Sequence, residues 1–223
     1  MNALIKRTVL IAIVLSATAV LPGCVAGRWL GYVFAPSSNT KKVPAEYEGL
    51  ENSKVAVIVD IEQKTLFGHE GLPRELIQII NRDLTRNVKG VTTVEPARVI
   101  AYQAAYPEWR GEDRTKIARD LEADNLLYVT IIEFSTLEPG SVNLVRARLV
   151  AEATVWKAGL PEREARQYRT ETFRVLYPEH APVGLPTENQ YRVRVIAERI
   201  FSDRLTKKFY DHKVDLVKEG EEL

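Results

Sequence analysis

The sequence is poor in the residue types that bind metals or act as nucleophiles. Its 223 residues include one cysteine, Cys24, and three histidines, His69, His180 and His212. These residues are not spaced from one another as zinc ligands usually are. Motifs of serine hydrolases, phosphate-binding loops and zinc proteases are also missing. We therefore expect no metal site, no cofactor and no enzymatic activity.

The chain also lacks an excess of charge of one sign and a hydrophobic run long enough to span a bilayer. It has 31 Lys and Arg against 30 Asp and Glu, a formal net charge of +1. Nucleic-acid binding needs a clustered basic surface, so this balance argues against a nucleic-acid partner. The apolar stretch 9–21 covers about 20 Å as a helix, too little for a hydrocarbon core of about 30 Å. Because it follows Lys6 and Arg7, it has the form of a signal-peptide core.

The apolar stretch ends in Leu21, Pro22, Gly23 and Cys24. This ending resembles the lipobox of bacterial lipoproteins, in which cleavage follows the small residue, here Gly23, and the cysteine carries the lipid. Pro22 departs from that pattern, where a small or β-branched residue is usual. A chance free thiol in an ordinary secretory signal is the alternative. Lipidation leaves neither a reactive thiol nor a disulfide partner, which favours a covalent lipid, palmitate among its acyl chains, on Cys24.

The residues after the cysteine bear on localisation. Val25 stands where some lipoproteins of Gram-negative bacteria have aspartate, and the resemblance then implies export to the outer membrane. We expect a lipid-anchored protein of the cell envelope that faces the periplasm and contacts membrane lipid through Cys24. Trp29, Tyr32 and Phe34 follow within a few residues. These rings lie in the lipid headgroup layer, pack against the domain, or dock a partner.

The remaining pattern predicts one α/β domain after a tether. We divide the chain into a lipoprotein signal peptide (1–23), a lipidated N-terminus and tether (24–50), a single α/β domain (51–212) and a flexible acidic tail (213–223). Residues 54–61 and 126–134 are apolar on both faces, which is typical of central strands. Residues 145–156 and 167–177 alternate apolar and polar, which predicts antiparallel strands with one solvated face.

Four segments have helical signals. Pro73 opens a helix that ends at Gly90, Pro96 opens a second, and the pair Glu112 and Asp113 can cap a third. Thr187 and Gln190 form a capping box for the last helix, which runs to about residue 210. The predicted fold is therefore mixed α/β, with a central mixed sheet of about five strands flanked by three to four helices.

Two short segments resemble a group of bacterial envelope proteins. Residues 91–100 give a strand, an acid and a helix, and residues 123–129 give an Ala-Asp lead into an apolar strand. The group contains the curli-secretion lipoprotein, the lipoproteins that activate penicillin-binding proteins, and the amino-terminal domain of the Tol-system β-propeller protein. The resemblance covers residues 54–210 and implies a mixed sheet, no catalysis and contact with other envelope components. The charged hairpin around Pro161 departs from the apolar hairpins of the curli pore.

Acidic residues near the ends of the central strands are weak ligand candidates. Asp60 and Glu62 end the first of these strands, and Glu133 lies near the end of the second. Open α/β sheets often place ligand groups there, although such acids also mark where strands leave the core. The alternating strands form either a solvated face of charge pairs or an anionic-ligand surface, with the candidates Arg146, Arg148, Glu152, Arg169 and Glu171.

These observations support one function and two alternatives. The main prediction is a membrane-anchored lipoprotein that acts as a non-catalytic interaction or assembly module, with other envelope proteins as partners and oligomerisation open. The first alternative is a small-ligand or glycan-binding lipoprotein that uses residues 178–186 as a lid. The second is a hydrolase with Asp60, Glu62 or Glu133 as acid and base, which needs two facing carboxylates.

Overall fold

The computed structural model describes residues 40–66, 68–184 and 187–215. The chain divides into two compact units, Lys42–Lys213 and the combination of Met1–Lys41 with Val214–Leu223. The predictions for Gly23, Cys24, Trp29, Tyr32 and Phe34 lie outside the described residues.

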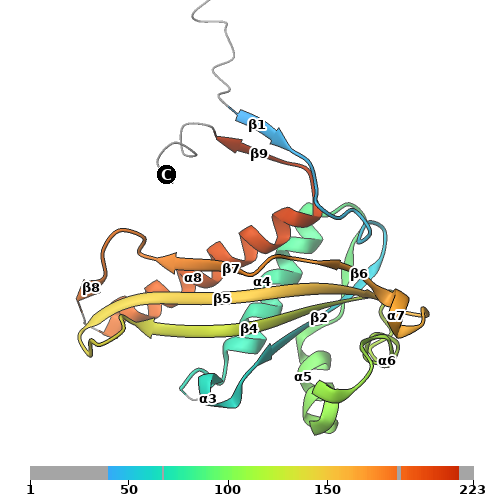
Figure 1. Ribbon diagram of the computed structural model, residues 1–223, viewed down its shortest axis with the longest axis horizontal. Helices are drawn as coiled ribbons and strands as arrows, with labels where there is room; N and C mark the ends of the chain where they lie inside the picture. The colour runs from blue at the N-terminus through green and yellow to red at the C-terminus, as the bar shows by residue number, and fades with distance from the viewer. Residues whose placement is uncertain (1–39, 67, 185–186, 216–223) are drawn as a thin grey trace, which may run out of the picture. The chain divides into compact units, whose positions relative to one another are not determined.

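A mixed sheet of seven strands forms the centre of the larger unit (Figure 1). Its main path runs in the order β3 (Thr92–Thr93), β2 (Lys54–Ile61), β4 (Asn125–Leu137), β5 (Leu144–Lys157) and β6 (Arg166–Arg169). Two further strands, β7 (Phe173–Tyr177) and β8 (Val183–Gly184), also pair with β5. The mixed α/β class is confirmed. The number of strands is seven and not about five, because two of them have only two residues and one predicted strand is divided.

The two strands predicted as central, β2 and β4, are parallel neighbours. Their register places Val57 beside Leu127 and Ile58 beside Tyr128, and all four side chains are buried. Successive side chains in a strand point to opposite faces, so both faces of this pair are apolar. β2 is also parallel to β3, whereas β4 and β5 form an antiparallel hairpin. The sheet therefore has a parallel half and an antiparallel half.

The strand expected over residues 167–177 is divided into β6 and β7 at Thr170. The Thr170 Oγ1 accepts the backbone N–H of Ala153 at 2.9 Å, and the Thr170 N–H donates to the Ala153 carbonyl at 2.9 Å. The hydroxyl thus takes the place of a backbone acceptor at the point where the ladder is interrupted. The buried hydroxyl keeps Ala153 paired across the break.

Helices cover the two faces of the sheet unequally. α4 (Leu72–Asn87) and α8 (Thr187–Thr206) pack side by side on one face, behind the strands in Figure 1. α5 (Pro96–Ala105), the 3₁₀ helix η1 (Pro107–Gly111) and α6 (Arg114–Asp120) connect β3 to β4. Trp109 of η1 and Arg114 of α6 contact Tyr128, which places this segment on the opposite face of the parallel half. Short α3 (Gln63–Leu66), α7 (Glu162–Ala165) and η2 (Lys207–Phe209) complete the helices described.

α4 and α8 run in the same direction. Arg194 contacts Glu75 near the start of α4, and Ser202 contacts Asp83 two turns further along both helices. Since α4 follows β2 after one short turn of helix, its N-terminus lies at the end of the sheet where β2 ends. The N-termini of both long helices therefore lie at the carboxyl ends of the parallel strands, where open α/β sheets place their ligands.

The described domain extends beyond the residues predicted for it. Leu50, the last residue of the predicted tether, is fully buried in the core, and Tyr47 stacks on Tyr168 with ring centroids 5.4 Å apart. β1 (Thr40–Val43) pairs with β9 (His212–Asp215), which includes the first residues of the predicted tail. Long-range pairing of this kind leaves no local pattern in the sequence.

The Thr170 hydroxyl generates a test of the divided strand. Thr170→Val keeps the shape of the side chain but leaves the buried Ala153 N–H without its acceptor. We expect the free energy of unfolding to fall by about 1–3 kcal/mol, measured by urea denaturation. Thr172→Val changes an exposed threonine in the same segment and should have little effect. Equal stabilities of the two variants would contradict the role given to Thr170.

Candidate functional site

Asp60, the first acidic candidate, is held in a structural cluster. The Tyr128 hydroxyl donates to Oδ2 of Asp60 at 2.7 Å, and Nε of Arg110 donates to Oδ1 at 2.8 Å. Burial and the Asp60 carboxylate together raise the pKa of Tyr128, so its phenol remains a donor. Arg114 lies over the Tyr128 ring at 4.1 Å and donates to backbone carbonyls of η1 and of Glu112. Asp60 therefore anchors the η1–α6 segment to the sheet.

The other two acidic candidates have different surroundings from Asp60. Glu133 forms an ion pair with Arg148 at 3.4 Å. Glu62 is exposed just after β2, and its carbonyl accepts the N–H groups of Thr65 and Leu66 at the start of α3. Asp60 and Glu133 therefore contact different partners, Tyr128 and Arg110 in the first case and Arg148 in the second. The contacts favour the view that these acids mark the places where strands leave the core.

The charge pairs expected on the antiparallel strands are present. Arg169 lies 2.7 Å from Glu152 across β6 and β5, as the alternation predicts. Arg148 pairs with Glu133 of β4, and Arg146 lies 3.8 Å from Glu138. Each of these arginines has a carboxylate neighbour, so the face is a mixed-charge surface and not a basic patch for an anionic ligand. Glu171 is exposed beside β6.

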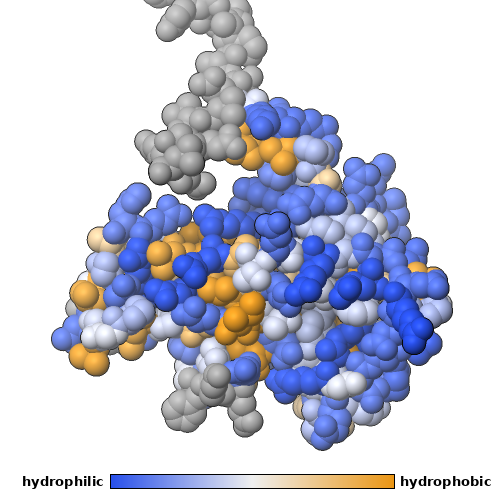
Figure 2. Space-filling view, in the orientation of Figure 1, coloured by the Kyte–Doolittle hydropathy of each residue, from blue (hydrophilic) through white to orange (hydrophobic). Residues whose placement is uncertain are grey.

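An apolar area lies within this mixed-charge surface. A register shift between Ile131 and Glu133 interrupts the β4–β5 pairing, and the side chain of Ile132 between them is 52% exposed. Val150, which is only 8% exposed, pairs with Glu133 and Arg174 on the face away from α8. Figure 2 shows apolar surface over the middle of β4, β5 and β7, with charged surface on both sides. In the described part of the chain, no helix covers this area.

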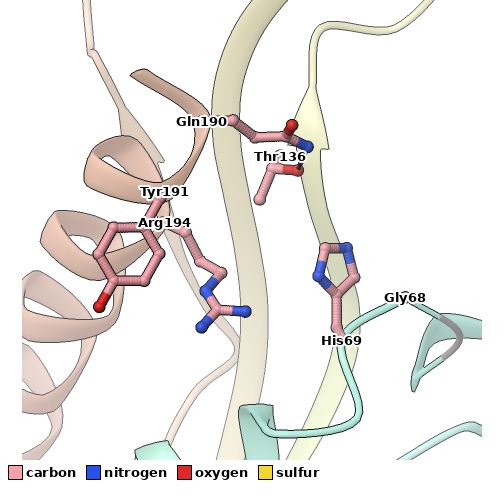
Figure 3. A pocket seen from close by; sticks show the side chains of 6 residues that line it. All are labelled: Gly68, His69, Thr136, Gln190, Tyr191 and Arg194. Carbon is pink, nitrogen blue, oxygen red and sulfur yellow. Dashed lines mark hydrogen bonds between the residues drawn. The ribbon is translucent and has the colours of Figure 1, made fainter. Parts of the chain in front are cut away.

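A polar pocket lies on the other side of the sheet, at the N-termini of α4 and α8 (Figure 3). Its volume is about 230 Å³, and it is lined by Gly68, His69, Thr136, Gln190, Tyr191 and Arg194. The side chains come from the loop before α4, from the end of β4 and from α8. The fold thus assembles the pocket from three segments that are distant in sequence.

Two hydrogen-bonding groups of the pocket are fixed by the sheet. Nε2 of Gln190 donates to Oγ1 of Thr136 at 2.8 Å, so the Gln190 side chain reaches towards β4. The ring of His69 meets the edge of Phe134 at 4.8 Å between centroids. Burial, followed by the positive charge of Arg194, lowers the pKa of His69, which is therefore a neutral imidazole at pH 7.

Arg194 connects the pocket to a pair of carboxylates. Its Nη2 lies 2.6 Å from Oε2 of Glu75 on α4, and its Nε lies 3.2 Å from Oε1 of Glu198, one turn further along α8. Glu198 is only 1% exposed. Burial raises the pKa of Glu198 to about 7, an effect that Arg194 opposes and the charge of Glu75 reinforces. A second hollow of about 550 Å³ lies beside Glu198 and shares Tyr191 with the pocket.

The sequence analysis did not identify Arg194 and Glu198. A local signal was available, because the two residues have the i,i+4 spacing of a helical ion pair and Glu198 directly follows the buried Ala197. Glu75 is 119 residues from Arg194, so only the folded chain shows that it completes the group.

Neither a metal-binding cluster nor a membrane-spanning helix is found among the described residues. They contain no group of three or more His, Cys, Asp or Glu side chains arranged to hold a metal ion. No helix among them combines the length and the apolar character needed to cross a bilayer.

The buried carboxyl group of Glu198 predicts a pH-dependent stability. Between its ordinary pKa of 4.5 and about 7, the folded protein keeps a proton that the unfolded chain releases. Stability should therefore fall as the pH rises through this window. Glu198→Gln has no titrating group at this position. Its free energy of unfolding, relative to that of the wild-type protein, should therefore increase by about 3 kcal/mol between pH 4.5 and pH 8.

Urea denaturation at several pH values measures this difference, with Glu162→Gln on the exposed surface of α7 as the control. A difference between Glu198→Gln and the wild-type protein that stays constant with pH would contradict the explanation.

Comparison with known proteins finds similarity in solved structures. No protein-family model and no curated protein matches the chain. The lipoprotein GNA1162 from Neisseria meningitidis is 11% identical with a TM-score of 0.41, covering 68% of this chain and 99% of its own. A PelC dodecamer from Paraburkholderia phytofirmans is 8% identical with a TM-score of 0.40, covering 73% and 94%. A minor lipoprotein from Acinetobacter baumannii is 14% identical with a TM-score of 0.33, covering 70% and 90%.

The solved structures similar to this chain thus include bacterial lipoproteins. The resemblance to the curli, penicillin-binding-protein activator and Tol group remains a prediction.

Proposed function

We propose that this chain is a lipid-anchored, non-catalytic interaction or assembly module of the bacterial cell envelope. The proposal places the lipid on Cys24, most simply in the outer membrane, with the domain in the periplasm. Its anchor is supported by the signal-like stretch that ends at Gly23 and Cys24. The fifteen or so residues between Cys24 and β1 span at most about 50 Å when extended, which limits the distance between the domain and the membrane.

The observation that carries the interaction role is the sheet face around Ile132 and Val150. An apolar centre with a polar rim is the usual composition of a protein–protein interface. Here the rim consists of ion pairs, of which Glu152 with Arg169 is the shortest at 2.7 Å. Because both signs of charge are present, the face suits a partner protein of mixed charge better than an anionic polymer. The partner is therefore another protein of the envelope.

Removal of the lipid site tests the anchor. Cys24→Ser cannot be acylated, so the protein should move from the membrane to the soluble fraction, because the acyl chains provide the membrane affinity. Cell fractionation measures the distribution, and thermal unfolding should be unchanged because Cys24 precedes the domain. A variant that stays in the membrane fraction would contradict lipid anchoring through Cys24.

Photocrosslinking tests the interaction face. A photoreactive amino acid in place of Ile132 should give one reproducible adduct with another envelope protein in intact cells. The same group in place of Val142, which is 78% exposed in the β4–β5 turn, is the matched control and should not give this adduct. Mass spectrometry identifies the second chain.

The identity of the crosslinked chain distinguishes a partner protein from a second copy of this chain on the face. An adduct of two copies of this chain would replace the partner protein with self-association. No adduct at Ile132, or the same adduct at Val142, would overturn the assignment of this face.

A second candidate function is the binding of a small ligand. The polar pocket of Figure 3 supports it, because several hydrogen-bonding groups converge there at the carboxyl ends of the parallel strands. Residues 178–184 approach the β4–β5 hairpin through β8, while residues 185 and 186 lie outside the described residues. The lid over residues 178–186 remains a prediction. The hydrolase alternative gains no support from the separate contacts of Asp60 and Glu133.

A further inference from the structure

The carboxylates near Arg194 lie on the side of its guanidinium group that faces away from the pocket. Glu75 contacts its Nη2 and Glu198 its Nε, and both carboxylates line the neighbouring hollow. Among the described residues, those that line the pocket include no carboxylate. In the described part of the chain, Nη1 of Arg194 has no hydrogen-bond or ion-pair partner. The guanidinium thus offers donors to the pocket while its charge is balanced from the other side.

The N-termini of the two long helices lie at the same end of the sheet as the pocket, and the first turn of α4 contains Glu75. α4 begins three residues after His69, and α8 begins three residues before Gln190. Helix N-termini carry a partial positive charge and favour anions, and here two of them lie at the same end of the sheet.

The size and the neutral groups of the pocket limit its occupant. A volume of about 230 Å³ is smaller than the clefts of roughly 300–1,000 Å³ that hold drug-sized ligands. The carbonyl oxygen of Gln190 and the hydroxyl of Thr136 suit the hydroxyl groups of a ligand. The ring of Tyr191 is 65% exposed at the rim and offers an apolar face.

We propose that this pocket binds a small polyhydroxylated ligand, of about the size of one sugar ring, through a single carboxylate or phosphate group. Nη1 of Arg194 and a ring nitrogen of His69 hold the oxyanion, since Figure 3 shows both side chains extending towards the same space from opposite sides. Gln190 and Thr136 bind its hydroxyl groups. The inference rests on the second candidate function and does not depend on the interaction face around Ile132.

Three probes with the same sugar ring test the proposal. D-glucuronate carries a carboxylate, D-glucose 6-phosphate carries a phosphate, and D-glucose has no charge. Full-length protein purified from membranes in detergent is titrated with each probe at matched ionic strength, and thermal unfolding reports binding because a ligand of the folded state raises the Tm. At least one anion should bind tenfold or more tightly than glucose. The anion that binds better distinguishes a carboxylate from a phosphate ligand.

Variants connect the binding to Arg194. Arg194→Gln alone leaves buried Glu198 without its cation, so the substitution is made together with Glu198→Gln. Glu198→Gln alone should keep the preference for the anion, whereas the double variant should lose at least tenfold in affinity. Arg192→Gln makes the same change of charge on the exposed side of α8 and is the matched control.

Two results would overturn the proposal. One is that neither anion binds, or that glucose binds as tightly as both. The other is that the double variant keeps its affinity or that Arg192→Gln loses as much. Crosslinking through Ile132 should be the same in all of these variants, so failure of the pocket and failure of the interaction face are distinguishable.

Discussion

The parallel pairing of β2 with β4 is the constraint on which the rest of the structure depends. Both strands are apolar on both faces, so helices must cover both sides of the pair. Parallel strands also need long crossover connections, and α4 and the α5–α6 segment provide them on opposite faces. Asp60 then fastens the second crossover to the sheet through Arg110 and Tyr128. Asp60, a ligand candidate in the sequence, thus holds the second crossover connection in place.

The two faces of the antiparallel half of the sheet differ in their burial. β5 is fully buried on the side of α8, where Ala147, Leu149 and Ala151 are inaccessible to solvent, whereas Val150 on the other side is 8% exposed. The other side is left to arginine and glutamate side chains that pair across the strands, with Ile132 exposed among them at the irregular point of β4. Because exposed ion pairs contribute little to stability, we attribute this composition to recognition more than to folding.

The contact between α4 and α8 has the opposite character. Within it, Arg194 brings together Glu75 from one helix and buried Glu198 from its own. A buried carboxyl group with a raised pKa lowers stability at neutral pH, and such perturbed groups gather at functional sites. The pocket lies at the same end of the helices. The carboxylates balance the charge of Arg194 from one side, while its other side faces the proposed ligand space in the pocket.

The sequence alone determined several of the strands and helices and one local cap. The two-sided apolar pattern of residues 54–61, the alternation of 145–156 and the cap at Asp113 depend on neighbouring residues, and the structure has each of them. Only the tertiary structure decided the sites. Asp60 meets Arg110 across 50 positions and Arg194 meets Glu75 across 119, and the break at Thr170 depends on a backbone group of another strand. Local periodicity fixes which side of an element is buried, whereas the choice of polar partners depends on which elements the sheet brings together.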